Sequence, residues 1–126
     1  MKYSGKDRIA VNAIRALSMD QITHANTGHT GITLSAAPLV YGIYKNMKID
    51  ASDPKWFNRD RFVVSGGHGS AMLYAILHLN GYDISIDDLK KFRTLGSKTP
   101  GHPEITTPGV DAATGPLGQG FGMAVG

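Results

Sequence analysis

The sequence contains no cysteine, and this absence excludes disulfide bonds and thiolate metal sites. No apolar run approaches the length of a transmembrane helix, and the first residues lack the apolar segment of a signal peptide. No charge sign dominates, since 13 Lys and Arg stand against 10 Asp and Glu. A net charge of +3, scattered along the chain, argues against nucleic acid as a partner. These absences predict a cytoplasmic protein that binds neither nucleic acid nor membrane.

Glycine is the most unusual part of the composition, at 16 of 126 residues. Most glycines fall in short clusters between apolar stretches, where they usually mark tight turns or a close approach of the backbone to a ligand. Hydrophobic residues make up 41% and charged residues 18% of the sequence, which is typical of a globular protein. The length of 126 residues fits one domain or a piece of one.

Capping signals and apolar periodicity predict a mostly helical chain. Ser4 and Asp7 form a capping box, which predicts a helix that ends near Ala25. The β-branched run at residues 61–65 predicts one short buried strand. The other expected elements are a helix over about 35–47 with Pro38 in its first turn, a buried helix over about 69–79, a helix from Ser85 to about Arg93, a loop over 95–115 and a helix from about Pro116. Because the last apolar pattern continues to Gly126, we expect the chain to be a fragment of a longer protein.

Three of the five histidines lie next to glycine, namely His29, His68 and His102. Glycine neighbours have no side chains and leave the imidazole open to a ligand. An imidazole can donate or accept hydrogen bonds and can move a proton near neutral pH, so we expect the three to share a site. His24, in the last turn of the first helix, and His78, within the apolar third helix, have sufficient structural explanations and are given no catalytic role.

Two glycine-rich turns are candidate ligand sites. The turn at residues 66–70, Gly-Gly-His-Gly-Ser, lies between the predicted strand and a predicted helix, where backbone amides attract phosphate. It has neither the P-loop nor the dinucleotide pattern, and an ordinary tight turn remains the alternative. The turn at residues 114–120 fits a flat ligand, unless Thr114 is only a helix cap. No spacing of Asp, Glu and His gathers three metal ligands, so no metal site is expected within the chain.

Four motifs, in order along the chain, resemble the signature motifs of the transketolase family. They are Ala-Asn-Thr-Gly-His-Thr-Gly at 25–31, Arg-Asp-Arg-Phe-Val-Val-Ser-Gly-Gly-His-Gly-Ser at 59–70, Ser-Lys-Thr-Pro-Gly-His-Pro-Glu at 97–104 and Thr-Gly-Pro-Leu-Gly-Gln-Gly at 114–120. The first departs from the family pattern at Thr30, where proline is usual. The resemblance spans almost the whole chain. It implies an α/β fold of the thiamine-diphosphate-binding type, with a parallel sheet.

Within that fold, residues 1–126 are expected to be the N-terminal part of the pyrophosphate-binding domain, truncated at its C-terminal end. This segment is expected to be mostly helical, with one or two short strands. The resemblance also implies roles for individual residues. His29 and His102 face the sugar near the reactive carbon, as substrate-binding and catalytic residues. The implied cofactor-binding residues, which hold the diphosphate and the aminopyrimidine, are His68, Gly115, Pro116 and Leu117.

The implied activity is transfer of a two-carbon ketol unit between sugar phosphates in the pentose phosphate pathway, by a homodimer. Mg²⁺ or Ca²⁺ is expected to bind through ligands beyond Gly126, and an activating glutamate is expected from another domain. Because these groups lie outside the chain, we expect the isolated segment to bind thiamine diphosphate weakly and to show no turnover. The alternatives are another thiamine-diphosphate enzyme, such as dihydroxyacetone synthase, and a truncated chain without catalytic activity.

Overall fold

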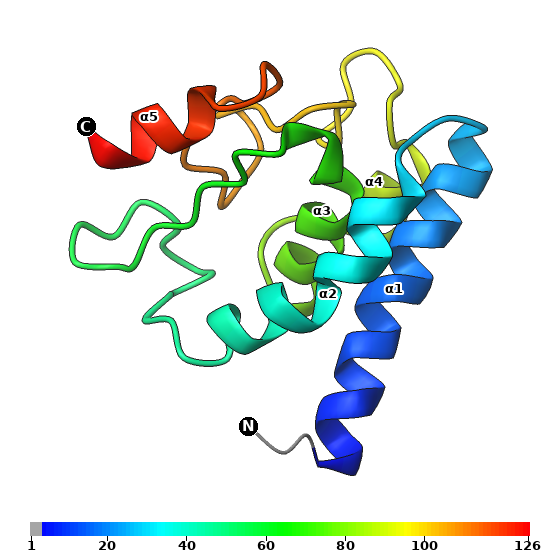
Figure 1. Ribbon diagram of the computed structural model, residues 1–126, viewed down its shortest axis with the longest axis horizontal. Helices are drawn as coiled ribbons and strands as arrows, with labels where there is room; N and C mark the ends of the chain where they lie inside the picture. The colour runs from blue at the N-terminus through cyan, green and yellow to red at the C-terminus, as the bar shows by residue number, and fades with distance from the viewer. Residues whose placement is uncertain (1–3) are drawn as a thin grey trace.

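The computed structural model describes residues 4–126 and consists of helices joined by loops. Helix α1 (Gly5–Ala25) and helix α2 (Thr30–Tyr44) follow each other through a short turn, and both pack against helix α3 (Ser70–Leu79) (Figure 1). These three helices form the body of the molecule. No helix within the described residues is long and apolar enough to cross a membrane.

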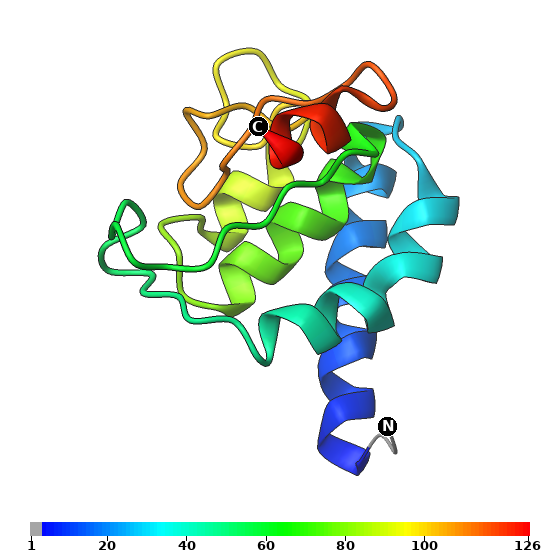
Figure 2. The same ribbon diagram turned by 60° about the vertical axis from the view of Figure 1, so that its left-hand side comes forward.

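Three shorter helices complete the described chain. Helix α4 (Ile86–Lys90) packs against α1 and α3, and the 3₁₀ turn η1 (Gly67–Gly69) leads directly into α3. Helix α5 (Gln119–Val125) lies at the opposite end of the molecule from the start of α1, as both ribbon views show (Figures 1 and 2). Long loops connect α2 to η1 and α4 to α5, and the second of these contains His102 and Gly115 of the candidate site.

The start of α1 is fixed by the predicted capping box. The Ser4 hydroxyl accepts a hydrogen bond from the Asp7 amide at 3.2 Å, and the Asp7 carboxylate accepts one from the Ser4 amide at 2.7 Å. The same carboxylate accepts hydrogen bonds from Lys45 Nζ at 2.7 Å and from the Tyr41 hydroxyl at 2.6 Å. These donors, Lys45 first, hold the pKa of the Asp7 carboxyl well below its usual range. The capping box therefore also ties α1 to α2.

Helix α3 is the centre of the hydrophobic core. Every residue from Ser70 to Leu77 is buried, so the predicted buried helix is confirmed. Ile14 of α1 and Ala37 of α2 belong to the same buried cluster. Burying one large aliphatic side chain stabilises a protein by about 1.5–3 kcal/mol. This burial anchors α3, and η1 with it, at a fixed place beside α1 and α2.

Helix α2 begins earlier than predicted, and Pro38 lies inside it instead of in its first turn. Proline has no amide hydrogen, so the carbonyl of Leu34 loses its usual helical donor. Arg15 Nε on α1 donates to that carbonyl at 3.0 Å. A side chain on the neighbouring helix thus supplies the hydrogen bond that Pro38 cannot make. Nothing in the sequence of α2 itself indicates this donor.

The strand predicted at residues 61–65 is not confirmed, because no strand forms within the part of the chain that the structure describes. The segment bonds to side chains instead. Phe62 N–H donates to the Asp111 carboxylate at 2.9 Å, and the Val64 carbonyl accepts a hydrogen bond from Thr114 Oγ1 at 2.7 Å. A β-branched run forms a strand only where a partner strand is present, and residues 4–126 offer none.

Two further helix boundaries differ from the predictions. Helix α4 ends at Lys90, and Arg93 adopts a left-handed backbone conformation with a φ of 63°. Helix α5 begins at Gln119, not near Pro116. The loop predicted over residues 95–115 is confirmed. The turns around Arg93 and Pro116 are therefore longer than expected, and both lie near the candidate site.

Candidate functional site

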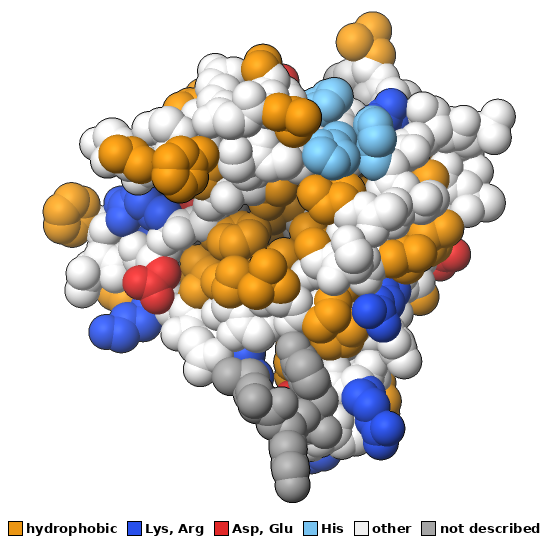
Figure 3. Space-filling model, in the orientation of Figure 1, with side chains coloured by type: hydrophobic (Ala, Val, Ile, Leu, Met, Phe, Trp, Pro, Cys, Tyr) orange, Lys and Arg blue, Asp and Glu red, His pale blue; other side chains and the backbone are white. Residues whose placement is uncertain are grey.

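Two of the three glycine-flanked histidines lie side by side. His29 directly precedes α2, and His68 lies in η1 at the start of α3. Their ring centroids are 5.1 Å apart, with an angle of 70° between the ring planes. His29 is exposed and His68 is half-buried, so a ligand can reach both rings. Figure 3 shows histidine side chains gathered in one patch on this face of the molecule.

His102 lies on a loop that is hydrogen-bonded to side chains of the buried helix α3. The Tyr74 hydroxyl donates to the His102 carbonyl at 3.2 Å. Ser70 Oγ donates to the Gly101 carbonyl at 2.7 Å. The exposed imidazole lies against Gly115, because a Cβ at that glycine would be 3.6 Å from His102 Cδ2. The third histidine is therefore next to the second predicted ligand turn.

The two glycine-rich turns pack directly against each other. A Cβ at Gly67 would lie 2.7 Å from the carbonyl carbon and oxygen of Thr114, so only glycine fits. A Cβ at Gly120 would lie 2.6 Å from Ser65 Cα. Thr114 Oγ1 donates to the Val64 carbonyl at 2.7 Å, while the residue that caps α5 is Gly118. Thr114 therefore joins the two turns and is not the helix cap that the sequence left as an alternative.

Both turns contain backbone N–H groups that could bind an anion. Within residues 4–126, the amides of Gly67 and His68 in one turn donate no hydrogen bond, nor do those of Gly115 and Leu117 in the other. Backbone donors of this kind are satisfied by water or by a ligand. Pro116, between the two donors of the second turn, has no amide hydrogen. Open N–H groups in two packed turns, beside an imidazole, fit the diphosphate of thiamine diphosphate, the cofactor that the resemblance implies.

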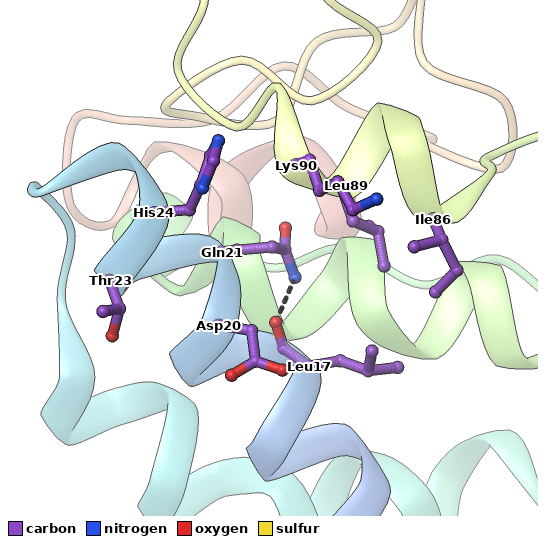
Figure 4. A pocket seen from close by; sticks show the side chains of 8 residues that line it. All are labelled: Leu17, Asp20, Gln21, Thr23, His24, Ile86, Leu89 and Lys90. Atoms are coloured by element: carbon purple, nitrogen blue, oxygen red, sulfur yellow. Dashed lines mark hydrogen bonds between the residues drawn. The ribbon is translucent and has the colours of Figure 1, made fainter.

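The other two histidines lie outside this cluster. His24 lies in the last turn of α1, as predicted, and Nδ1 of His78 is 2.7 Å from the Ile84 carbonyl oxygen. His24 also lines a separate pocket of about 400 Å³ between α1 and α4, together with Gln21 and Leu89 (Figure 4). That pocket contains none of the three glycine-flanked histidines, so it is distinct from the candidate site.

No three His, Asp or Glu side chains in the described part of the chain are arranged to hold a metal ion. The adjacent carboxylates at the start of α4 have a structural role instead. Asp88 accepts a hydrogen bond from the Ser85 amide at 2.8 Å and completes a capping box at the start of this helix.

No pattern in the sequence indicates that Arg93 is a neighbour of the site. Its Nη1 donates to Thr27 Oγ1 at 3.1 Å, close to His29 along the chain. Its side chain also lies against Gly101, the residue before His102. The contact with Thr27 has no local signal, because Thr27 and Arg93 are far apart in the sequence and neither belongs to a helix. The contact with Gly101 lies within an irregular loop, whose shape no periodic pattern indicates.

Comparison with known proteins identifies the family. The family described as "Transketolase, thiamine diphosphate binding domain" matches residues 6–126. The chain belongs to the transketolase family. It is 57% identical over 125 residues to the transketolase of Kluyveromyces lactis, and 58% identical over 122 residues to that of Geobacillus stearothermophilus. These matches cover 99% and 95% of the chain but 18% of each relative, so the chain spans about a fifth of their length.

Solved transketolase structures share the fold. A transketolase from Campylobacter jejuni superposes with a TM-score of 0.95 at 51% identity, covering 98% of this chain and 20% of that one. A transketolase from Pichia stipitis, solved as a complex with sedoheptulose-7-phosphate, superposes with a TM-score of 0.92 at 53% identity, covering 94% of this chain and 18% of that one. The helical arrangement described above is therefore part of the transketolase N-terminal, thiamine-diphosphate-binding fold.

Proposed function

We propose that this chain is part of a transketolase, which transfers a two-carbon ketol unit from a ketose phosphate to an aldose phosphate with thiamine diphosphate as cofactor. The main support is the convergence of His29, His68 and His102 on two glycine turns with open N–H groups. Family membership adds to it. The Pichia stipitis proteins solved with sedoheptulose-7-phosphate and with xylulose-5-phosphate support sugar phosphates as substrates.

The cofactor is proposed to lie across the two turns. His68 and the amides of Gly67, Gly115 and Leu117 would hold the diphosphate and the ring next to it, with Pro116 stiffening the second turn. When bound, thiamine diphosphate supplies the carbon nucleophile and the electron sink for cleavage beside a carbonyl. The protein supplies the orientation, because the packed turns leave these donors little freedom to move.

His29 and His102 are proposed to bind the sugar and to move protons. Both imidazoles are exposed, and both lie beside a residue of the proposed cofactor site, His68 for one and Gly115 for the other. Cleavage and transfer of a ketol unit require a hydroxyl proton to leave and later to return. An imidazole in this position can accept that proton or donate a hydrogen bond to the sugar oxygen.

Other properties of the complete protein are part of the same proposal. Mg²⁺ or Ca²⁺ would be bound by residues beyond Gly126. The complete enzyme would be a cytoplasmic homodimer of the pentose phosphate pathway. A second thiamine-diphosphate activity, such as that of dihydroxyacetone synthase, is the alternative and uses the same cofactor turns.

Residues 61–65 are proposed to join a parallel sheet in the complete protein. Within residues 4–126, the amides of Val63, Val64 and Ser65 donate no hydrogen bond. A β-branched segment with open amides is suited to pairing with a neighbouring strand. Pairing there would place the turn at residues 66–70 at the carboxyl end of a strand, where α/β folds bind their ligands.

The decisive experiment is a two-carbon transfer assay on the purified complete enzyme. We expect turnover of a ketose phosphate and an aldose phosphate that depends on added thiamine diphosphate and a divalent cation. Removal of the cation with a chelator should abolish turnover, and residues 1–126 alone should bind the cofactor weakly and turn nothing over. Turnover with formaldehyde but not with aldose phosphates would favour dihydroxyacetone synthase, and no turnover with any ketose donor would refute the proposal.

His68→Ala tests the cofactor turn in the complete enzyme. The loss of a hydrogen bond to a charged group costs about 1.5–3 kcal/mol, so the dissociation constant of thiamine diphosphate should rise roughly ten- to a hundredfold. Calorimetric titration of the apoenzyme measures it, with His78→Ala as the control because that side chain bonds only to a local carbonyl. An unchanged dissociation constant for His68→Ala would remove this residue from the cofactor site.

A further inference from the structure

Arg93 occupies an unusual position for a surface arginine. Its backbone is left-handed, with a φ of 63°, a conformation that costs a residue with a side chain about 1–2 kcal/mol. Its amide donates to the Thr99 carbonyl at 2.9 Å. This hydrogen bond closes the turn between residues 93 and 99 and holds Arg93 in the left-handed conformation. The guanidinium carbon lies 5.5 Å from the ring centroid of buried Phe92, an attractive cation–π arrangement. The side chain is thus held in one place at the edge of α4.

The Arg93 side chain bridges the loops of two proposed catalytic histidines. Toward the first, Nη1 donates to Thr27 Oγ1 at 3.1 Å, two residues before His29. Toward the second, a Cβ at Gly101 would lie 3.4 Å from both Cγ and Nε of Arg93. The arginine therefore fills the space beside the residue that precedes His102. Its hydrogen bond to Thr27 and its packing against Gly101 join these two loops directly.

One buried donor of the guanidinium has no partner among the described residues. Nε of Arg93 is buried and makes no hydrogen bond within the described residues. A buried charged donor without an acceptor is costly, and it is tolerated where the surroundings hold it for another reason. Here the neighbours of the guanidinium are the two histidine loops.

We propose that Arg93 is a positioning residue for the transfer reaction, which fixes the loop of His29 relative to the loop of His102. This inference rests on the proposed function, because it concerns the geometry of that site. The guanidinium reaches neither imidazole through any described hydrogen bond, so its effect passes through Thr27 and Gly101. A shift of one loop by a fraction of an ångström changes the distance between the two imidazoles, and catalysis is sensitive to errors of that size.

The first test uses four variants of the complete enzyme: Arg93→Ala, Arg93→Lys, Thr27→Val and the Arg93→Ala/Thr27→Val double variant. Arg93→Ala should lower kcat/KM for the donor ketose about ten- to a hundredfold, the range expected when a hydrogen bond from a charged group is lost. The loss should fall mainly on kcat, with the dissociation constant of thiamine diphosphate within about twofold of wild type. Arg93→Lys should recover only part of the activity, since lysine lacks the planar guanidinium group with its several N–H donors.

Thr27→Val removes the acceptor and keeps the arginine. It should lose less than Arg93→Ala, and the double variant should be no worse than Arg93→Ala, because one interaction is removed twice. Added guanidinium chloride at millimolar concentration should partly restore Arg93→Ala and leave Thr27→Val unchanged. Lys91→Ala, which removes an exposed cation nearby, is the matched control and should match wild type. Additive losses, or no response to guanidinium, would overturn the proposal.

The second test does not depend on activity. Hydrogen exchange at the Thr27 amide, which donates to the Ile22 carbonyl, and at the residue-93 amide, which donates to the Thr99 carbonyl, should become faster in Arg93→Ala, while the amides of α3 keep their protection. Thr27→Val should show the same pattern more weakly. Unchanged exchange at both amides would overturn the positioning role even if the enzyme is a transketolase. Faster exchange without any transfer activity in the wild-type enzyme would instead leave the loop contact standing and refute the proposed function.

Discussion

His29→Ala and His102→Ala variants of the complete enzyme should each lose about ten- to a thousandfold in kcat/KM for the donor ketose, because proton transfer by a placed imidazole typically contributes about 10²–10⁴. Both side chains are exposed beside the proposed cofactor turns, and neither is needed for packing. A contact made only in the transition state lowers kcat, whereas one made equally in the ground state raises KM alone. We expect a mixture of the two effects.

The affinity for thiamine diphosphate separates these histidines from His68. It should stay near the wild-type value in both variants, since the proposed partners of His29 and His102 are sugar oxygens. His24→Ala is the matched control, because His24 is also exposed but lies in the separate pocket between α1 and α4. Steady-state kinetics and a calorimetric titration make the comparison. Near-native kinetics in both variants would leave the two residues as loop spacers without a role in the sugar site.

Gly67→Ala should reduce cofactor affinity about five- to a hundredfold, since overpacking in a tight site typically costs about 1–3 kcal/mol. The added methyl carbon would lie 2.7 Å from the Thr114 carbonyl group, and this is backbone that cannot rotate away. The turn containing His68 and the turn containing Gly115 must then separate. Because the proposed diphosphate donors come from both turns, a small separation weakens all of them together.

A glycine with open surroundings provides the control for that substitution. A Cβ at Gly5, in the first turn of α1, would meet nothing within 4 Å, so Gly5→Ala should leave affinity unchanged. Melting temperatures of both variants, measured without cofactor, show whether the Gly67 variant still folds. A folded Gly67→Ala enzyme with wild-type affinity would contradict the packing of the two turns.

The elements that depend on residues close together in the sequence were predictable from it. The Ser4–Asp7 capping box and the wholly apolar helix α3 are local patterns, and both are confirmed. The glycines beside His29 and His68 are also a local pattern and mark both imidazoles as candidates, although the contact between the two rings comes from tertiary packing. Such patterns are reliable because the interactions that produce them lie within one or two turns of the chain.

The features that depend on distant residues were not predictable. Pro38 is tolerated inside α2 because Arg15, on another helix, binds the carbonyl that proline leaves open. Residues 61–65 have the composition of a strand, yet pairing requires a neighbour that the described residues do not contain. The position of Arg93 beside Thr27 is likewise a product of tertiary packing. Local propensity cannot report any of these contacts.

The anchoring of the His102 loop to α3 has a consequence for how the enzyme should respond to heat. Tyr74 and Ser70 are fully buried in the core helix, and the same two side chains hold the carbonyls of His102 and Gly101. The loop of His102 therefore has little freedom to melt while the core stays intact. Inactivation on heating should then coincide with cooperative unfolding of this domain, without an earlier stage in which a folded but inactive protein accumulates.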